Sequence, residues 1–322
     1  MVRSRRRRRP LFGPLGGPPT DAAGPPGSPI PPGGPSRRTL LSGAAALGLL
    51  GITGAAGCAR IDPDGGDPLE RLRARGVVRL GIASEIPYSY IDEDDGSLTG
   101  QSPAIAREIF GRLGIERFQP VLTEFGSLIP GLRARQFDVV AAGMWISPER
   151  CEQVIFSDPD YVAKDAFIVA EGNPLGITDY ASLAESGATS ATGPGWFQRD
   201  YAVGNGVDPG SIGTYPDQLA GLNAVRHGRI DAFFGTAPTM TAAVREGSGV
   251  EVTEPFVPVV DGEEQLGAGG FAFRPDETAL RDAFNTELHD LKATGRLLEL
   301  VEPYGFTEED MTDLTAEELC SP

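Results

Sequence analysis

The segment from residue 123 to 161 constrains the fold more than any other stretch of this chain. Within it, residues 127–135 carry apolar side chains at the i, i+1, i+4 spacing of a short helix packed on one side. Residues 137–142 form a short apolar run that is typical of a buried strand. A helix that leads directly into a buried strand is typical of a βαβ unit, so this segment predicts an α/β fold.

A turn and a second helix follow the predicted strand. Ser147 and Pro148 suit the N-cap and the first position of that helix. Trp145 and Arg150 therefore lie beyond the carboxyl end of a strand, which is where open α/β sheets bind ligands. A guanidinium can hold a carboxylate through two parallel hydrogen bonds, and an indole can stack on a cationic or flat group. Taken singly, Arg150 is equally well a solvated helix residue and Trp145 a core residue; together they favour a site for a small zwitterion.

Charge is distributed unevenly along the 322 residues, whose net charge is −17. Residues 1–57 contain eight arginines and one acid, which leaves 20 basic and 44 acidic residues in the rest of the chain. This excess of acidic residues after residue 57 argues against nucleic acid as a partner. Three cysteines without a CxxC pair and two histidines offer no zinc-type site, so we expect neither a metal nor a cofactor.

The first 68 residues have the composition of export and tether segments rather than of a folded domain. Residues 1–35 are rich in Arg, Pro and Gly and are expected to be disordered. Residues 36–57 begin S-R-R-T-L-L, similar to a twin-arginine export signal, and their apolar run falls short of the roughly 20 residues of a spanning helix. The run ends at A-A-G before Cys58, which resembles a lipidation site, although an ordinary buried or disulfide cysteine is the alternative. Residues 58–68 then form a flexible tether, and the protein is expected to be lipid-anchored on the outer face of the cytoplasmic membrane.

The alternation of helix and strand patterns occurs twice in the remaining chain, which predicts two doubly wound lobes with a hinge and a cleft between them. Residues 69–168 form the first lobe, in which residues 165–170 are either its last strand or the crossover out of it. Residues 169–267 form the second lobe. The chain then returns to the first lobe with residues 268–306, and residues 307–322 are a C-terminal tail.

Several short motifs in residues 69–306 resemble the bacterial extracellular solute-binding proteins of polar amino acid type (family 3), which serve ABC importers. They are G-x-x-x-E-x-P-Y after the first strand, F-D-V-V-A-A-G-M, S-P-E-R, G-R-I-D-A-F-F-G and the terminal G-R-L-L-E-L-V-E-P-Y-G-F. Within that family, E-I-P-Y, L-T-E-F-G-S-L-I-P-G-L and A-A-G-M-W-I-S-P-E-R-C are most similar to members that bind the compatible solutes ectoine and hydroxyectoine.

The resemblance implies a type II periplasmic-binding-protein fold and roles for individual residues of the first lobe. Tyr88, Phe125 and Trp145 would form an aromatic cage, with a tryptophan at the last position where the family suggests a smaller aromatic. Arg150 would take the ligand carboxylate and Glu85 the ring nitrogens. The protein would then be a monomeric, non-enzymatic binder that closes about its hinge and delivers its ligand to a membrane permease and its ATPase.

Further residues complete the predicted site. Gly195, Trp196 and Thr236 are candidates to close over the ligand from the second lobe, although a turn glycine and packing side chains explain them equally well. Cys151 and Cys320 form a disulfide outside the membrane or remain two free thiols.

Two other functions fit the same scaffold. One is a binder of polar or cationic amino acids, which would call for an acid in the second lobe to hold the α-ammonium group. Thr236 occupies the strand end where such an acid would be useful, which weakens that alternative. The other is a cyclohexadienyl dehydratase-like lyase with Glu85 as proton donor or base, but no histidine or nucleophile–base pair supports it.

Overall fold

The computed structural model describes residues 66–244 and 247–321. The predicted leader, export signal, Cys58 lipidation site and most of the tether therefore lie outside the described residues. Within the part of the chain that is described, no helix is both long enough and apolar enough to cross a membrane.

The first lobe is built on a sheet with the strand order β4-β1-β5-β15-β6, and β7 also pairs with β15. β1 runs parallel to β4 and β5, whereas β15 is antiparallel to β5, β6 and β7. These strands are β1 (Val78–Ile82), β4 (Phe118–Leu122), β5 (Val139–Trp145), β6 (Ile155–Phe156), β7 (Tyr161–Ala163) and β15 (Gly267–Phe273).

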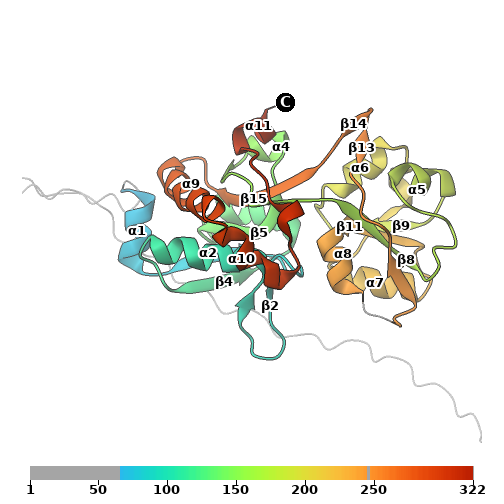
Figure 1. The fold of residues 1–322 in the computed structure, drawn as a ribbon, viewed down its shortest axis with the longest axis horizontal. Helices are drawn as coiled ribbons and strands as arrows, with labels where there is room; N and C mark the ends of the chain where they lie inside the picture. Colours follow the sequence, from blue (N-terminus) through green and yellow to red (C-terminus); the bar gives the residue numbers. More distant parts are fainter. Residues whose placement is uncertain (1–65, 245–246, 322) are drawn as a thin grey trace, which may run out of the picture. The chain divides into compact units, whose positions relative to one another are not determined.

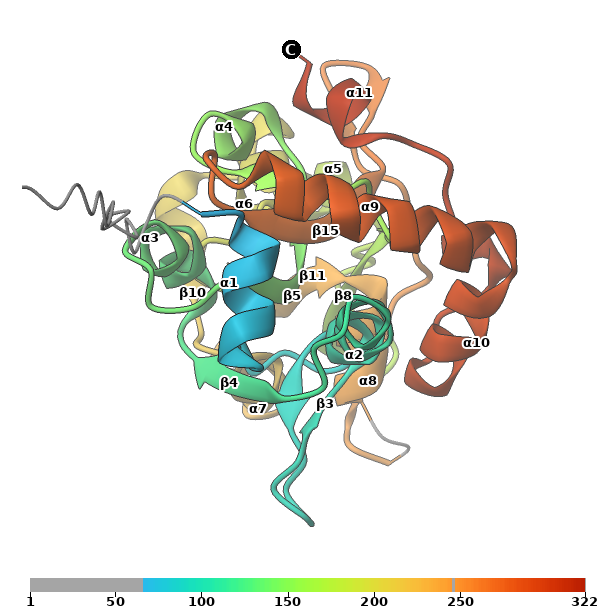
Figure 2. The same cartoon turned by 90° about the vertical axis from the view of Figure 1, so that its left-hand side faces the viewer.

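Helices cover both faces of this sheet, because neighbouring residues of its buried strands point to opposite sides. Val139 of β5 belongs to one apolar cluster and Val140 to another. On the Val139 side lie α1 (Pro68–Arg75), α2 (Gln101–Arg112), α9 (Thr278–Ala293) and α10 (Arg296–Val301), which stand in front of the sheet in Figure 2. On the Val140 side lie α3 (Leu128–Arg133), α4 (Pro148–Cys151) and α11 (Ala316–Cys320).

The second lobe repeats the plan with the strand order β10-β9-β11-β8-β12, shown with its helices in Figure 1. Its strands are β8 (Asp165–Ala170), β9 (Ser190–Thr192), β10 (Ile212–Thr214), β11 (Ala232–Thr236) and β12 (Val250–Val252). Apolar residues of α5 (Tyr180–Ser186) and α6 (Gln198–Gly204) pack on one face of this sheet, and those of α7 (Gln218–Arg226) and α8 (Ala237–Ala243) pack on the other.

Short elements complete the described chain. They are the hairpins β2 (Tyr90–Ile91) with β3 (Leu98–Thr99) and β13 (Val259–Val260) with β14 (Glu263–Glu264), and the 3-10 turns η1 (Phe125–Ser127), η2 (Pro209–Ser211), η3 (Glu302–Tyr304) and η4 (Glu308–Asp310).

The chain passes between the two sheets twice, and the first passage is not where the sequence placed it. β7 ends at Ala163 in the first sheet and β8 begins at Asp165 in the second, so the predicted boundary at 168/169 cuts through a strand of the second lobe. The physical reason is that β8 pairs antiparallel with β11, a partner that an apolar run cannot reveal. On the return, β15 already begins at Gly267, one residue before the predicted first-lobe segment. Asp165 and Phe256 exchange backbone hydrogen bonds of 2.9 Å, which joins the two connecting segments.

Candidate functional site

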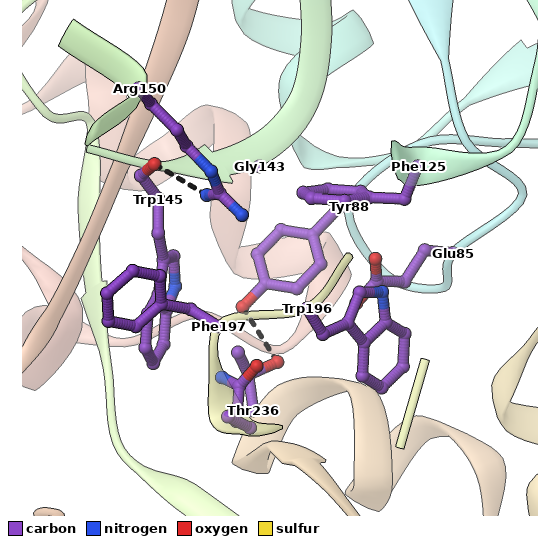
Figure 3. A pocket seen from close by; sticks show the side chains of 10 residues that line it. Glu85, Tyr88, Phe125, Gly143, Trp145, Arg150, Trp196, Phe197 and Thr236 are labelled. Atoms are coloured by element: carbon purple, nitrogen blue, oxygen red, sulfur yellow. Dashed lines mark hydrogen bonds between the residues drawn. The ribbon is translucent and has the colours of Figure 1, made fainter. Parts of the chain in front are cut away.

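One pocket brings the predicted site residues together where the two lobes meet (Figure 3). Its cavity volume is about 20 Å³, the space of roughly one water molecule, so its own side chains nearly fill it. Its walls are Glu85, Tyr88, Phe125, Gly143, Trp145, Arg150, Trp196, Phe197, Gln198 and Thr236. Gly195 joins them through its carbonyl oxygen, which accepts a hydrogen bond from Arg150. All eight residues proposed from the sequence as ligand-binding are therefore neighbours.

Arg150 extends from α4 into the middle of the pocket. Its Nη1 donates to the carbonyl oxygen of Trp145 at 2.7 Å and its Nη2 to that of Gly195 in the second lobe at 3.1 Å. The guanidinium carbon lies 5.5 Å from the ring centroid of Phe125 and 5.9 Å from that of Phe197. Burial lowers the pKa of Arg150 to about 10, so the side chain remains a cation at neutral pH.

Gly195 permits a close approach of the two lobes. Its φ of 78° lies in the left-handed region, and a Cβ atom there would stand 2.9 Å from the Cα of Gly126 in the first lobe. A larger residue would hold the lobes apart at the point where Arg150 crosses between them.

Glu85 is the acid of this pocket. Its side chain is buried, and Oε1 accepts a hydrogen bond of 2.8 Å from the hydroxyl of Thr239 on α8. Burial raises the pKa of Glu85 to about 7, while the hydrogen bond from Thr239 and the positive charge of Arg150 act in the opposite direction. The carboxyl group therefore changes its charge near neutral pH.

A chain of hydroxyl groups connects Glu85 with Tyr88 through the second lobe. The Tyr88 hydroxyl donates to Thr236 Oγ1 at 3.1 Å, and Thr236 donates to Thr239 Oγ1 at 3.0 Å. Thr239 in turn donates to Glu85. These contacts with the second lobe thus orient both first-lobe side chains at once.

Aromatic packing fixes the walls. The Tyr88 ring lies 5.0 Å from Tyr161 and 5.7 Å from Phe306, and the Trp145 ring lies 6.0 Å from Tyr201. The indole Nε1 of Trp145 is buried and has no hydrogen-bond partner within residues 66–244 and 247–321.

Gly143, Phe197, Gln198 and Thr239 belong to this site but were not predicted. Phe197 directly follows the predicted Trp196, and Thr239 lies one helical turn after Thr236. Those spacings were the only signals in the sequence, and they are too common to identify a site. The Gln198 side chain is fixed by a hydrogen bond outside the pocket, in which its Nε2 donates to Asp165 Oδ1 at 3.0 Å.

Replacing Gly143 by alanine is expected to destabilise the fold by about 2–5 kcal/mol. Gly143 has φ 57°, and a Cβ atom there would lie 2.3 Å from Cδ1 of the Tyr88 ring. The left-handed backbone contributes about 1–2 kcal/mol and overpacking about 1–3 kcal/mol. Gly187→Ala is the matched control, because Gly187 has φ 63° with nothing within 4 Å of a Cβ atom. Urea unfolding measures the free energy of unfolding of both variants. Equal losses of stability would show that the contact with the Tyr88 ring does not destabilise the fold.

Two α/β lobes joined by two connections, with a charged and aromatic pocket where they meet, define a ligand-capturing protein of the type II periplasmic-binding class. The family model for bacterial extracellular solute-binding proteins, family 3, matches residues 78–308, and the chain belongs to this family. The predicted family and fold class are therefore confirmed.

Three comparisons refine this assignment. The chain is 38% identical over 259 residues to a probable amino-acid ABC transporter periplasmic-binding protein, y4tE, of Sinorhizobium fredii, covering 79% of this chain and 86% of the relative. The crystal structure of EhuB in complex with hydroxyectoine is 35% identical with a TM-score of 0.73, covering 80% of this chain and 99% of that one. An ancestral arginine-binding protein bound to arginine is 26% identical with a TM-score of 0.63, covering 71% and 98%. The chain is accordingly an exported, non-enzymatic solute-binding protein of an amino-acid-type ABC importer.

Proposed function

We propose that this protein captures ectoine or hydroxyectoine. The observation that carries the proposal is the presence of Arg150 and Glu85 in a single pocket whose other walls are largely aromatic. Ectoine combines a carboxylate with a delocalised amidinium on a small ring, and the pocket offers a partner for each group. The similarity to the structure of EhuB with hydroxyectoine supports the same ligand class.

Arg150 takes the carboxylate. A guanidinium has five N–H donors, and the backbone carbonyls of Trp145 and Gly195 use two of them. The remaining donors suffice for a bidentate contact with a carboxylate, and the existing two bonds keep the guanidinium plane in place.

Glu85 and the aromatic rings take the amidinium. A ring face attracts a diffuse cation by up to about 2 kcal/mol when both are desolvated, and an ionised carboxylate adds a charge-assisted hydrogen bond. The buried Nε1 of Trp145 supplies a further donor for an oxygen of the solute.

The acid content of the pocket separates this ligand from a cationic amino acid. Glu85 is the only acid among the residues that line the described pocket, and it comes from the first lobe. Arginine and lysine each carry two cationic groups, so one of the two would be buried without a carboxylate partner, which is energetically unfavourable. Ectoine carries a single cationic group, which Glu85 can pair.

The proposal extends to the way the ligand is delivered. Closure of the second lobe adds contacts that the open form lacks, and the closed, loaded monomer would dock on the permease of the importer. Lipidation of Cys58 would tether the protein at the outer face of the cytoplasmic membrane.

A ligand panel tests the proposal. Thermal unfolding and calorimetry of the full chain with ectoine, hydroxyectoine, proline betaine, glutamine and arginine should show stabilisation by the first two solutes. At 100 times its dissociation constant, a ligand adds about 2.7 kcal/mol of stability. Stabilisation by arginine or glutamine alone would replace the proposed ligand with an amino acid.

A further inference from the structure

The helix that carries Arg150 is too short to hold itself in place. α4 comprises the four residues Pro148–Cys151. Isolated helices of this length do not form in water, because their few hydrogen bonds do not offset the free-energy cost of nucleation. Its N-terminal end is fixed by Ser147, whose side chain accepts from the backbone N–H of Arg150. Its C-terminal end therefore depends on contacts from elsewhere in the chain.

A disulfide supplies that contact. Cys151, the residue directly after Arg150, is bonded to Cys320 on α11, 169 residues further along the chain, and their Cα atoms are 5.7 Å apart. Figure 1 shows α11 beside α4 at the edge of the first lobe. Cys151 and Cys320 also pack against the apolar cluster that contains Ala316 at the start of α11.

α11 is itself anchored to the first lobe, mainly through Asp158. Asp158 Oδ1 accepts from the backbone N–H of Ala316 at 2.9 Å. Its Oδ2 lies 2.7 Å from His289 Nε2 and accepts from Asn285 Nδ2 at 3.3 Å, and both partners are on α9. Cys320 therefore lies on a helix that is itself fixed to the first lobe.

We propose that the Cys151–Cys320 disulfide and α11 are a positioning device of the binding site, which hold α4 so that the Arg150 guanidinium meets the ligand carboxylate. This rests on the proposed function, in which Arg150 binds that group. The C-terminal residues 307–321 are then part of the binding machinery, although none of them lines the described pocket.

A double-mutant cycle on the full chain tests the proposal. Affinities for ectoine and hydroxyectoine are measured by calorimetry in four proteins: wild type, Cys151→Ala/Cys320→Ala, Arg150→Ala and the triple variant. Removing the disulfide should weaken binding about tenfold or more when Arg150 is present, and less than twofold when it is absent. An equal loss in both backgrounds, or no loss, would overturn the proposal, since a purely structural bond acts independently of Arg150.

A second measurement needs no ligand. Hydrogen exchange of residues 147–154 should accelerate at least about tenfold in the cysteine variant, while residues 139–145 of β5 keep their protection. Unchanged exchange in 147–154 would overturn the proposal. If neither solute binds the wild type, the proposed function fails and this measurement still decides whether the disulfide fixes α4. Should the cysteine variant not fold, Asp158→Ala, which keeps the disulfide and releases the start of α11, replaces it in both experiments.

Discussion

Replacing Arg150 by alanine is expected to weaken the binding of ectoine and hydroxyectoine by at least about 100-fold. Two charge-assisted hydrogen bonds of about 1.5–3 kcal/mol each are lost, and each 1.4 kcal/mol is a factor of ten. The guanidinium also links Trp145 and Gly195 across the lobes, so its loss removes a contact between the two lobes. Calorimetry on the purified variant measures the change.

Two other substitutions make the result specific. Arg150→Lys keeps the charge but not the planar fork, so its affinity should fall between those of wild type and the alanine variant. Arg135→Ala removes an exposed arginine paired with Asp276 at 3.0 Å and should leave binding unchanged. Retention of affinity within threefold in Arg150→Ala would show that the carboxylate is held elsewhere.

The parts of the fold that sequence could predict are those fixed by local pattern. The helix predicted within residues 127–135 and the strand predicted within residues 137–142 overlap α3 and β5, because apolar spacing determines such elements locally. The predicted cap at Ser147 is present for the same reason. Trp145 and Arg150 were found because the carboxyl end of a buried strand is a place defined by the chain itself.

The parts that could not be predicted depend on distant partners. β8 has the composition of any buried strand, and only its pairing with β11 assigns it to the second sheet. Thr239 lies in α8, whose sequence A-P-T-M-T-A-A has no marked periodicity, and its role exists only because the other lobe brings Glu85 to it. From the sequence, Cys151 and Cys320 were equally compatible with a disulfide and with two free thiols, and only the fold, which places α11 beside α4, selects the disulfide.

Three of the distant contacts join a charged pocket residue, or the residue beside one, to an element outside the local motif. Glu85 meets Thr239 and Arg150 meets Gly195 across the lobes, while Cys151 is tied to α11. Local sequence therefore supplied the two charged groups, and the tertiary fold determines their orientation and ionisation.

The ionisation of Glu85 leads to the second large effect, a pH dependence of binding. With a pKa raised to about 7 by burial, the carboxyl group is largely protonated below that pH, whereas a cationic solute binds the ionised form. Binding then releases a proton, so affinity should rise with pH by up to about tenfold per unit below pH 7 and level off above it. Calorimetry of ectoine binding from pH 5 to 8 measures the slope.

Substitution separates Glu85 from the other acids with raised pKa. Asp160 and Asp165 also have pKa values raised to about 7 by burial, but they bond to Gln101 and Gln198 respectively and do not line the pocket. Glu85→Gln should therefore bind at least about 30-fold more weakly at pH 8 and lose the slope, since the amide neither ionises nor pairs with a cation. Glu124→Gln, at an exposed neighbouring position, should keep both affinity and slope. A slope that persists in Glu85→Gln would assign the proton to another group and remove Glu85 from cation binding.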